Sequence, residues 1–443
     1  MRESRIRRGS RASSVAIASI AVALFAISTF GLALSRDGSD NGNESIGTGR
    51  AAPSIASKSD IDGLTCEEQA TREACYDIEV AGRTWRYTIL PAEEVTNKTA
   101  IIDLGGPGSS ALSGELEIAQ FRSAHPELAR SYNLLVMEEP WVTEPVTSTC
   151  QAAMGRYYLS LRSTGKDDIS TTARDMAGAC GLSDGSGSWG FNAANYSALV
   201  TAIERKDKLR VAGFFGHSWG SVRLGYLQRQ LDWQVLTRPF PIGATAEQVV
   251  SLRTANMPNQ GVPERVIKND KITTPERSAP VNRFDQLSAI VELGYIDDRF
   301  YAESRAGVET GTDSTSIGRL SDRLWGRYGE WDVSPALLAR IQETCSALPP
   351  PNSVPSAVAS VKDLLRAELA PCKSLKATNV KHPPLAPRTC LVSGQQDAVT
   401  PDRLVSQRFE SWQSHGKWIK SGKRSHGSLD GLEQCLDYVL PDD

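Results

Sequence analysis

The stretch Leu209-Arg-Val-Ala-Gly-Phe-Phe-Gly-His-Ser-Trp-Gly-Ser221 decides the fold. It begins as an apolar run that is typical of a buried strand, and a helical pattern follows it from Val222 to Leu231. Between the two lies Gly-x-Ser-x-Gly, with Ser218 at its centre. Glycines on both sides of a serine let the chain turn sharply from strand to helix and leave the hydroxyl exposed above a sheet. Ser218 is therefore the candidate nucleophile.

Other apolar runs predict further strands of the same sheet. They are Thr84–Leu90, Ala100–Leu104, Tyr132–Met137, Thr389–Val392 and Lys417–Ile419. Helical patterns separate them, notably Ala193–Lys206, and Leu429–Leu440 closes the chain. Runs that are apolar on both faces and alternate with helices are typical of a mostly parallel sheet covered on both sides. The expected fold class is therefore α/β.

The alternation of strands and helices stops between about Ala244 and Lys381. This segment has a mixed helical pattern and is interrupted by Pro349-Pro350-Pro351. Because sheet strands are predicted on both sides of it, we expect an inserted cap or lid over residues 244–384. The core is then expected in two parts, residues 61–243 and 385–443.

The first 35 residues predict export. Five arginines, from Arg2 to Arg11, precede a long apolar run from Val15 to Leu34, which is typical of a segment that enters a membrane. The positive-inside rule places the chain after Ser35 outside the cytoplasm. Residues 1–35 are either a cleaved signal peptide or a retained membrane anchor, and residues 36–60, rich in Ser, Gly, Asn and Asp, are expected to form a flexible linker. The protein is thus expected to be secreted or anchored to the outer side of the plasma membrane.

Eight cysteines follow the apolar run, an even number that favours disulfides over zinc in an exported chain. No pair has C-x-x-C spacing. Free buried cysteines are the alternative. Closure between neighbours in the sequence would pair Cys66 with Cys75, Cys150 with Cys180, Cys345 with Cys372, and Cys390 with Cys435.

The overall composition excludes several classes of protein. The 443 residues include 49 Lys and Arg against 52 Asp and Glu, and 40% are hydrophobic. These values exclude a disordered chain, a collagen-like repeat and a nucleic-acid binder that relies on overall basicity. The sequence carries no cofactor motif, and we expect neither a metal nor a cofactor.

A serine nucleophile needs a base, and the chain has five histidines. His217 neighbours the serine and is expected to pack or line a pocket, while His125 and His382 are expected at the surface. Because catalytic groups gather at the carboxyl ends of parallel strands, His426, which follows Lys417–Ile419, is favoured over His415, which precedes it.

The acid is expected between the serine and the histidine in sequence. Asp397 lies just past the strand Thr389–Val392, and Thr400 and Pro401 after it resemble the N-cap and first residue of a helix. Asp402 would fall in the first turn of that helix. Asp397 is thus expected to hold the tautomer of His426.

Together Gly105-Gly106-Pro107-Gly108, the serine motif, Gly394-x-x-Asp397 and His426-Gly427 resemble the α/β-hydrolase fold. The sequence is most similar to the proline iminopeptidase and secreted tripeptidyl aminopeptidase group, over about residues 66 to 440. The resemblance implies a Ser218, Asp397 and His426 triad, an acyl-enzyme intermediate, and an oxyanion hole made by the N–H groups of Gly106 and Trp219.

The sequence departs from this group at two places. After Tyr132–Met137 the group carries Asp-Gln-Arg-Gly, whereas this chain reads Glu138-Glu139-Pro140-Trp141 and lacks the arginine. Where the group has a strand ending in Leu-Asp-Gly, this chain has Arg238-Pro239-Phe240-Pro241, and prolines fit poorly in a central strand. The fold and the hydrolytic chemistry survive these changes, and the peptide specificity is what they affect.

Three functions follow from this reading. The first is an exported serine exopeptidase acting on free peptide N-termini, and the second is a carboxylic-ester hydrolase, since fold does not fix function. The third is a non-catalytic binding module at the cell surface, against which the complete triad argues. The expected partners are a peptide or small ester substrate and, if the N-terminal segment is retained, the membrane. The acids in the insertion that could hold a substrate amine are Glu292, Asp297, Asp298 and Glu303.

Overall fold

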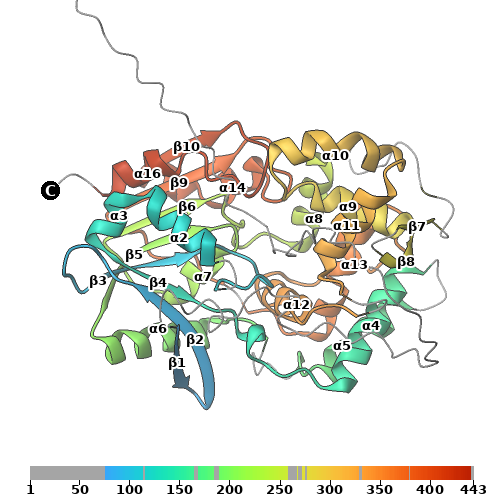
Figure 1. Ribbon diagram of the computed structural model, residues 1–443, viewed down its shortest axis with the longest axis horizontal. Helices are drawn as coiled ribbons and strands as arrows, with labels where there is room; N and C mark the ends of the chain where they lie inside the picture. The colour runs from blue at the N-terminus through green and yellow to red at the C-terminus, as the bar shows by residue number, and fades with distance from the viewer. Residues whose placement is uncertain are drawn as a thin grey trace, which may run out of the picture.

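The computed structural model (Figure 1) describes residues 75–112, 115–163, 168–183, 189–257, 267, 272–274, 277–328, 332–378 and 380–440. The predicted signal or anchor segment and the predicted linker lie outside these residues. Across the described ranges, no helix is both long enough and apolar enough to cross a membrane.

In the described part of the chain, eight strands form one open sheet in the order β1-β2-β4-β3-β5-β6-β9-β10. The strands are β1 (Cys75–Val80), β2 (Arg83–Leu90), β3 (Lys98–Asp103), β4 (Asn133–Met137), β5 (Arg210–His217), β6 (Trp233–Thr237), β9 (Arg388–Gly394) and β10 (Lys417–Ser421). The pairs β1–β2 and β2–β4 are antiparallel, and from β4 to β10 every neighbouring pair is parallel. The carboxyl ends of β3, β5, β6, β9 and β10 therefore meet at one edge.

The sheet contains two strands that the sequence analysis missed, β1 and β6. β6 ends at Thr237, so Pro239 and Pro241 follow it and do not interrupt it. The expectation that these prolines disturb a central strand is therefore wrong, because the backbone turns at Arg238, whose φ is +47°. All six strands predicted from apolar runs are present.

Alternation of side chains along the strands builds an apolar core on each face of the sheet. On one face, Phe214 packs with the helices α6 (Ala193–Asp207), α7 (Gly220–Leu227), α14 (Asp402–Arg408) and α15 (Glu410–His415). On the other face, Phe215 packs with α2 (Glu115–Ala124), α3 (Pro126–Ser131) and α16 (Leu432–Val439). This mostly parallel sheet with helices on both faces has the α/β-hydrolase fold and confirms the predicted fold class.

The segment between β6 and β9 is mostly helical and lies on one side of the sheet (Figure 1). It contains α8 (Ala246–Asn256), the hairpin β7 (Ile272–Thr274) and β8 (Arg277–Val281), α9 (Arg283–Glu292), α10 (Asp298–Thr310), α11 (Ser314–Trp325), α12 (Ala336–Ala347), α13 (Val361–Glu368) and the short helix η3 (Ala370–Ser374). Its apolar core also includes α4 (Ser148–Arg162) and α5 (Ile169–Ala179). We call α4, α5 and α8–α13 with η3 the helical body. The helices α4 and α5 lie in the range expected to belong to the sheet core, residues 61–243, but they pack into the helical body.

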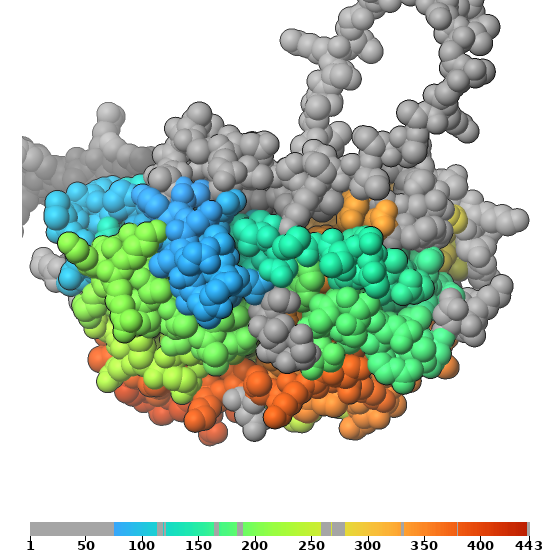
Figure 2. All heavy atoms as spheres, turned by 90° about the horizontal axis from the view of Figure 1, so that it is seen from below, coloured from blue at the N-terminus to red at the C-terminus, as the bar shows by residue number. Residues whose placement is uncertain are grey.

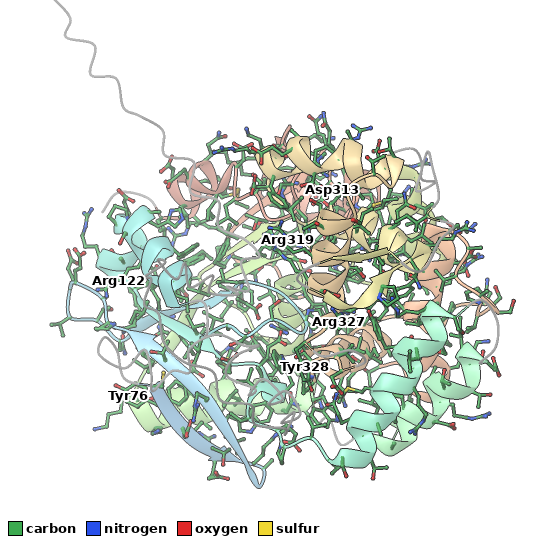
Figure 3. The ribbon with its side chains drawn as sticks, turned by 45° about the vertical axis from the view of Figure 1, so that its right-hand side comes forward. Tyr76, Arg122, Asp313, Arg319, Arg327 and Tyr328 are labelled. Carbon is green, nitrogen blue, oxygen red and sulfur yellow. A yellow bond between two sulfur atoms is a disulfide. The ribbon has the colours of Figure 1, made fainter. Side chains whose placement is uncertain are left out.

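Two further views place these parts relative to one another. In Figure 2, β1 and β2 lie beside α6, and α4 and α5 continue the same face. Figure 3 shows Tyr76 and Arg122 on the side of the sheet, while Asp313, Arg319 and Arg327 belong to the helical body.

Each of three disulfides joins a cysteine to the next cysteine along the chain. Cys150–Cys180 links α4 to the end of α5, Cys345–Cys372 links α12 to η3, and Cys390–Cys435 links β9 to α16. These are three of the four local pairings expected from the sequence. Cys75 is also disulfide-bonded, and Cys66, its expected partner, lies outside the described residues.

Candidate active site

Ser218 lies at the sharp turn between β5 and α7. Its φ is +51°, a left-handed conformation that is unusual for a residue other than glycine. Its N–H donates to the Thr237 carbonyl at 3.0 Å, and its own carbonyl accepts from Phe240 N–H at 2.9 Å. A Cβ at Gly220 would lie 2.9 Å from the Asp103 carbonyl oxygen, so the second glycine of the motif allows α7 to start against β3. The turn thus presents the serine at the carboxyl edge of the sheet.

Three side chains from three strand ends form a continuous hydrogen-bonded line. His426 Nε2 is 2.7 Å from Ser218 Oγ, and His426 Nδ1 is 2.8 Å from Asp397 Oδ2. Asp397 follows β9 and His426 follows β10, as the sequence analysis expected. The structure therefore brings the predicted nucleophile, base and acid together in the order that general-base activation of a serine requires.

Asp397 is fully buried and well supplied with donors. Its Oδ1 accepts from Val399 N at 2.7 Å and Thr400 N at 3.0 Å, and its Oδ2 accepts from Thr400 Oγ1 at 3.0 Å. Burial alone would raise the pKa of this carboxyl, but the neighbouring His426 and Arg238 charges and these hydrogen bonds hold the pKa well below its usual range. Thr400 was expected to be a helix N-cap and instead bonds the acid, because α14 starts one residue later than expected.

Arg238 is a site residue that the sequence analysis did not recognise. Its side chain is fully buried, with Nη1 3.3 Å from Asp397 Oδ2, and it donates to the carbonyls of Ser428 and Lys423. It therefore ties the loop of the acid to the loop of the histidine. The available signal was its position, since an arginine directly after a buried strand at the carboxyl edge needs an anionic partner there.

The glycine-rich loop after β3 is held by two consecutive glutamates. Glu138 accepts hydrogen bonds from Ser110 Oγ at 2.7 Å and Ala111 N at 2.8 Å, and Glu139 accepts from Gly108 N at 2.6 Å. Gly106 has a φ of +113°, and a Cβ there would lie 2.4 Å from Glu139 Oε1. Glu138 and Glu139, which stand where the group that the sequence resembles has Asp-Gln, thus anchor this loop.

A buried arginine of α7 lies beside Glu139. Arg223 is buried and contacts Glu139 at 2.5 Å, Glu343 of α12 at 3.0 Å and Asp103 at 3.3 Å. Burial raises the pKa of Glu139 to about 8, although the Arg223 charge opposes this shift. Burial also raises the pKa of Glu343, which accepts from the Trp219 indole N–H at 2.8 Å. One guanidinium thus contacts three carboxyl groups beside the turn at Ser218.

Ser218, Gly106 and Trp219 line one cavity, which the helical body covers. Positions three or four apart lie on one face of a helix, and three helices present such faces to the cavity. The lining side chains with this spacing include Val249 and Arg253 of α8, Arg340 and Thr344 of α12, and Leu365 and Glu368 of α13. The expected oxyanion residues and the expected nucleophile therefore share one covered, mostly apolar pocket.

The remaining histidines are placed outside the hydrogen-bonded line. His217 is buried with Nδ1 2.9 Å from Thr237 Oγ1, so it packs as expected. His125 was expected at the surface and is buried, 5% exposed, against Phe121. This expectation is wrong because the proline after His125 begins α3 and turns the ring into the core. His382 is exposed, and His415 lies 3.0 Å from the Ala386 carbonyl.

The four acids proposed to hold a substrate amine are used elsewhere. Glu292 is buried and pairs with Arg323 at 2.8 Å. Asp297 caps α10, Asp298 accepts from Ser425 N, and Glu303 forms an exposed pair with Arg299. Among the described lining residues, the acid is instead Glu368. No group of three or more described His, Cys, Asp or Glu side chains is arranged to hold a metal.

Comparison with known proteins gives structural matches of low score. Neither a family model nor a curated protein matches the sequence. A proline iminopeptidase-related protein from Thermus thermophilus is 10% identical, with 84% of this chain and 99% of that chain covered at a TM-score of 0.38. A hydrolase from Pseudomonas aeruginosa is 10% identical (83% and 98% covered, TM-score 0.36), and an enol-lactonase from Burkholderia xenovorans is 9% identical (82% and 98%, TM-score 0.33). At these scores the likenesses carry no argument about chemistry.

Proposed function

We propose that this chain is a serine hydrolase that cleaves carboxylic ester or amide bonds through an acyl-enzyme intermediate. The observation that carries the proposal is the line from Ser218 Oγ through His426 to Asp397, with separations of 2.7 and 2.8 Å. A buried acid that contacts a histidine, which in turn contacts a half-buried serine, is the arrangement that converts a weak hydroxyl into a nucleophile.

The steps follow from the geometry. Ser218 Oγ attacks the substrate carbonyl carbon while His426 Nε2 takes its proton, and Asp397 stabilises the imidazolium. The N–H groups of Gly106 and Trp219 would stabilise the oxyanion. The leaving alcohol or amine then takes the proton from His426, and a water activated by the same ring hydrolyses the acyl-enzyme to a carboxylic acid.

One finer proposal is an exopeptidase that acts on free peptide N-termini. This activity needs a carboxylate facing the substrate's ammonium group. Glu368 is the candidate because it lines the pocket that contains Ser218. Its ion pair with Arg340, at 3.1 Å, would have to open or be shared when the amine binds.

A second finer proposal is a carboxylic-ester hydrolase. The charge of the pocket favours it, since the described lining has two arginines and one glutamate. An ammonium group gains little beside a carboxylate that is already paired, whereas an ester needs no such partner.

We also propose that the protein works outside the cytoplasm, with which its disulfides are consistent.

The test uses the full chain exported to an oxidising compartment. Release of a chromogenic amine is compared between free and N-acetylated aminoacyl substrates, and release of p-nitrophenol is measured from a simple ester. Ser218→Ala is expected to lower kcat by at least about 1000-fold, whereas Ser414→Ala, at an exposed serine of α15, leaves it unchanged. Cleavage of free peptides alone identifies the exopeptidase, and cleavage of esters alone identifies the esterase. A folded protein inactive on all three substrates would overturn the proposal.

A further inference from the structure

The pocket beside Ser218 has an excess of positive charge. Of its described lining side chains, Arg253 and Arg340 carry guanidinium groups and Glu368 carries a carboxylate, so two positive charges face one negative charge. Most of the other lining side chains are apolar, and Arg253, Arg340 and Glu368 are each only partly exposed. Charged groups in such a setting act more strongly on a ligand than they would at an exposed surface.

Arg340 and Glu368 largely neutralise each other. Their charged groups are 3.1 Å apart, and Arg340 also donates to the Leu324 carbonyl at 2.6 Å. Arg340 Nη2 is nevertheless buried and has no acceptor in the described part of the chain. The pair therefore contributes no net charge but leaves one N–H group available.

Arg253 has no carboxylate partner among the described residues. Its Nη2 donates a 3.3 Å hydrogen bond to the Tyr295 hydroxyl, and its Cζ lies 6.0 Å from the centre of the Tyr295 ring. Its Nε is buried and, within the described ranges, finds no acceptor. A buried donor without an acceptor is costly unless a ligand satisfies it. An anionic ligand in the pocket would satisfy this N–H group.

Arg253 is connected to the reacting groups through one ring. Tyr295, which accepts its hydrogen bond, packs edge-on against His426 with ring centres 5.6 Å apart. Arg253 and Tyr295 line the same pocket as Ser218 and Gly106. A group bound by Arg253 would therefore lie in the space that the substrate must occupy.

We propose that the pocket selects substrates that carry a carboxylate in addition to the bond to be cleaved, and that Arg253 binds this carboxylate. The inference rests on the proposed serine hydrolase function and names its substrate class, a monoester or monoamide of a dicarboxylic acid. Water is consumed, the bond between the acyl carbon and the leaving group is broken, and a dicarboxylate is released. Arg340 supplies a second donor to the same anion through Nη2.

The test compares two esters of equal chain length, p-nitrophenyl hexanoate and mono-p-nitrophenyl adipate, on the full-length protein. The wild type is expected to show a kcat/KM at least about 10-fold higher for the adipate, because a charge-assisted hydrogen bond to a desolvated group stabilises the complex. Arg253→Gln is expected to lower kcat/KM for the adipate by about 10- to 100-fold and for the hexanoate by less than about 3-fold. Arg253→Lys should recover part of the adipate activity.

The matched control is Arg299→Gln, an arginine of α10 whose side chain is 90% exposed. It is expected to change neither ester's kcat/KM. The inference is overturned if Arg253→Gln lowers kcat/KM equally for both esters, or if the wild type does not prefer the adipate. In either case, cleavage of the hexanoate still supports the proposed function. If neither ester is cleaved and a fluorophosphonate fails to label Ser218, the proposed function itself fails.

Discussion

At the scale of single residues, the site depends on a buried charge that is matched by its neighbours. Asp397 is fully buried, where a lone carboxylate would take up a proton. The His426 ring and the Arg238 guanidinium contact the same oxygen, at 2.8 and 3.3 Å, and hold the pKa of Asp397 well below its usual range after burial is taken into account. Asp397 therefore stays ionised near neutral pH.

Removing Arg238 should affect both stability and activity. Arg238→Gln is expected to lower the free energy of unfolding by about 3–5 kcal/mol, since loss of one partner leaves a buried charge uncompensated. The pKa of Asp397 should rise in the variant, so that the acid limb of the activity profile moves to higher pH. Urea unfolding and the pH dependence of kcat measure the two effects.

An exposed arginine–aspartate pair provides the control. Arg210 and Asp232 are 2.8 Å apart, but their side chains are 49% and 42% exposed. Arg210→Gln is expected to cost at most about 1 kcal/mol, because water already solvates both charges. Similar losses of unfolding free energy in the two variants would show that burial does not increase the contribution of the Arg238–Asp397 pair to stability.

At the scale of elements, α7 and α12 meet in a buried cluster beside the glycine-rich loop after β3. Arg223 of α7 bridges Glu139 and Glu343, while Asp103 at the end of β3 lies on its other side. Glu343 also accepts from Trp219 and from Phe191 N at 2.9 Å. A helix of the helical body thus positions the turn that contains Ser218.

Glu139, in this cluster, should make the free energy of unfolding decrease as the pH rises. The folded pKa of Glu139, about 8, lies above the ordinary value of 4.5, so the folded state binds more protons than the unfolded state between these two pH values. By linkage, the contribution of Glu139 to stability is complete below about pH 4.5 and is lost as the pH rises toward 8. The charges that face Glu139 here are Arg223 and Glu343.

The measurement compares the wild type with Glu139→Gln. The difference in unfolding free energy, wild type minus variant, is expected to decrease between pH 5 and pH 8 and to level off above pH 8. Denaturant unfolding at five pH values gives this difference directly. A difference that stays constant, or that grows with pH, would show that Glu139 is ionised in the folded protein.

At the scale of the whole molecule, the site lies between the sheet and the helical body. His426 N donates to the Gly294 carbonyl after α9 at 3.1 Å, and Asn256 Nδ2 donates to the Asp397 carbonyl at 3.1 Å. Helices inserted between β6 and β9 therefore hold the loops of the acid and the base as well as covering the pocket. Stability of the helical body and geometry of the site should consequently be coupled.

Two disulfides of similar span test this coupling. Loss of Cys345–Cys372, which spans 27 residues, and loss of Cys150–Cys180, which spans 30, should each cost about 3 kcal/mol by chain entropy. Cys345 and Leu369 line the pocket, so the Cys345→Ser, Cys372→Ser double variant should also raise KM. Calorimetry and steady-state kinetics on both double variants provide the data. An equal rise in KM in both would contradict a local effect.

Sequence patterns determined the parts of the protein that depend on local chemistry. The apolar runs predicted six strands of the sheet, since burial on both faces requires continuous apolar stretches. The glycines around Ser218 predicted the turn, and chain order with strand-end position placed Asp397 and His426 in one site. These inferences succeed because the carboxyl ends of parallel strands converge whatever the rest of the fold does.

Tertiary structure alone decided the features that rest on contacts between distant segments. Arg238 and Asp397 are 159 residues apart, and Arg223 and Glu343 are 120 apart, so no local pattern pairs them. The same holds for the pocket, whose charge depends on which faces of α8, α12 and α13 turn inward. Burial of a charge is a property of the folded molecule, and it is burial that makes Arg238 a support for the acid and Arg253 a candidate for binding an anion.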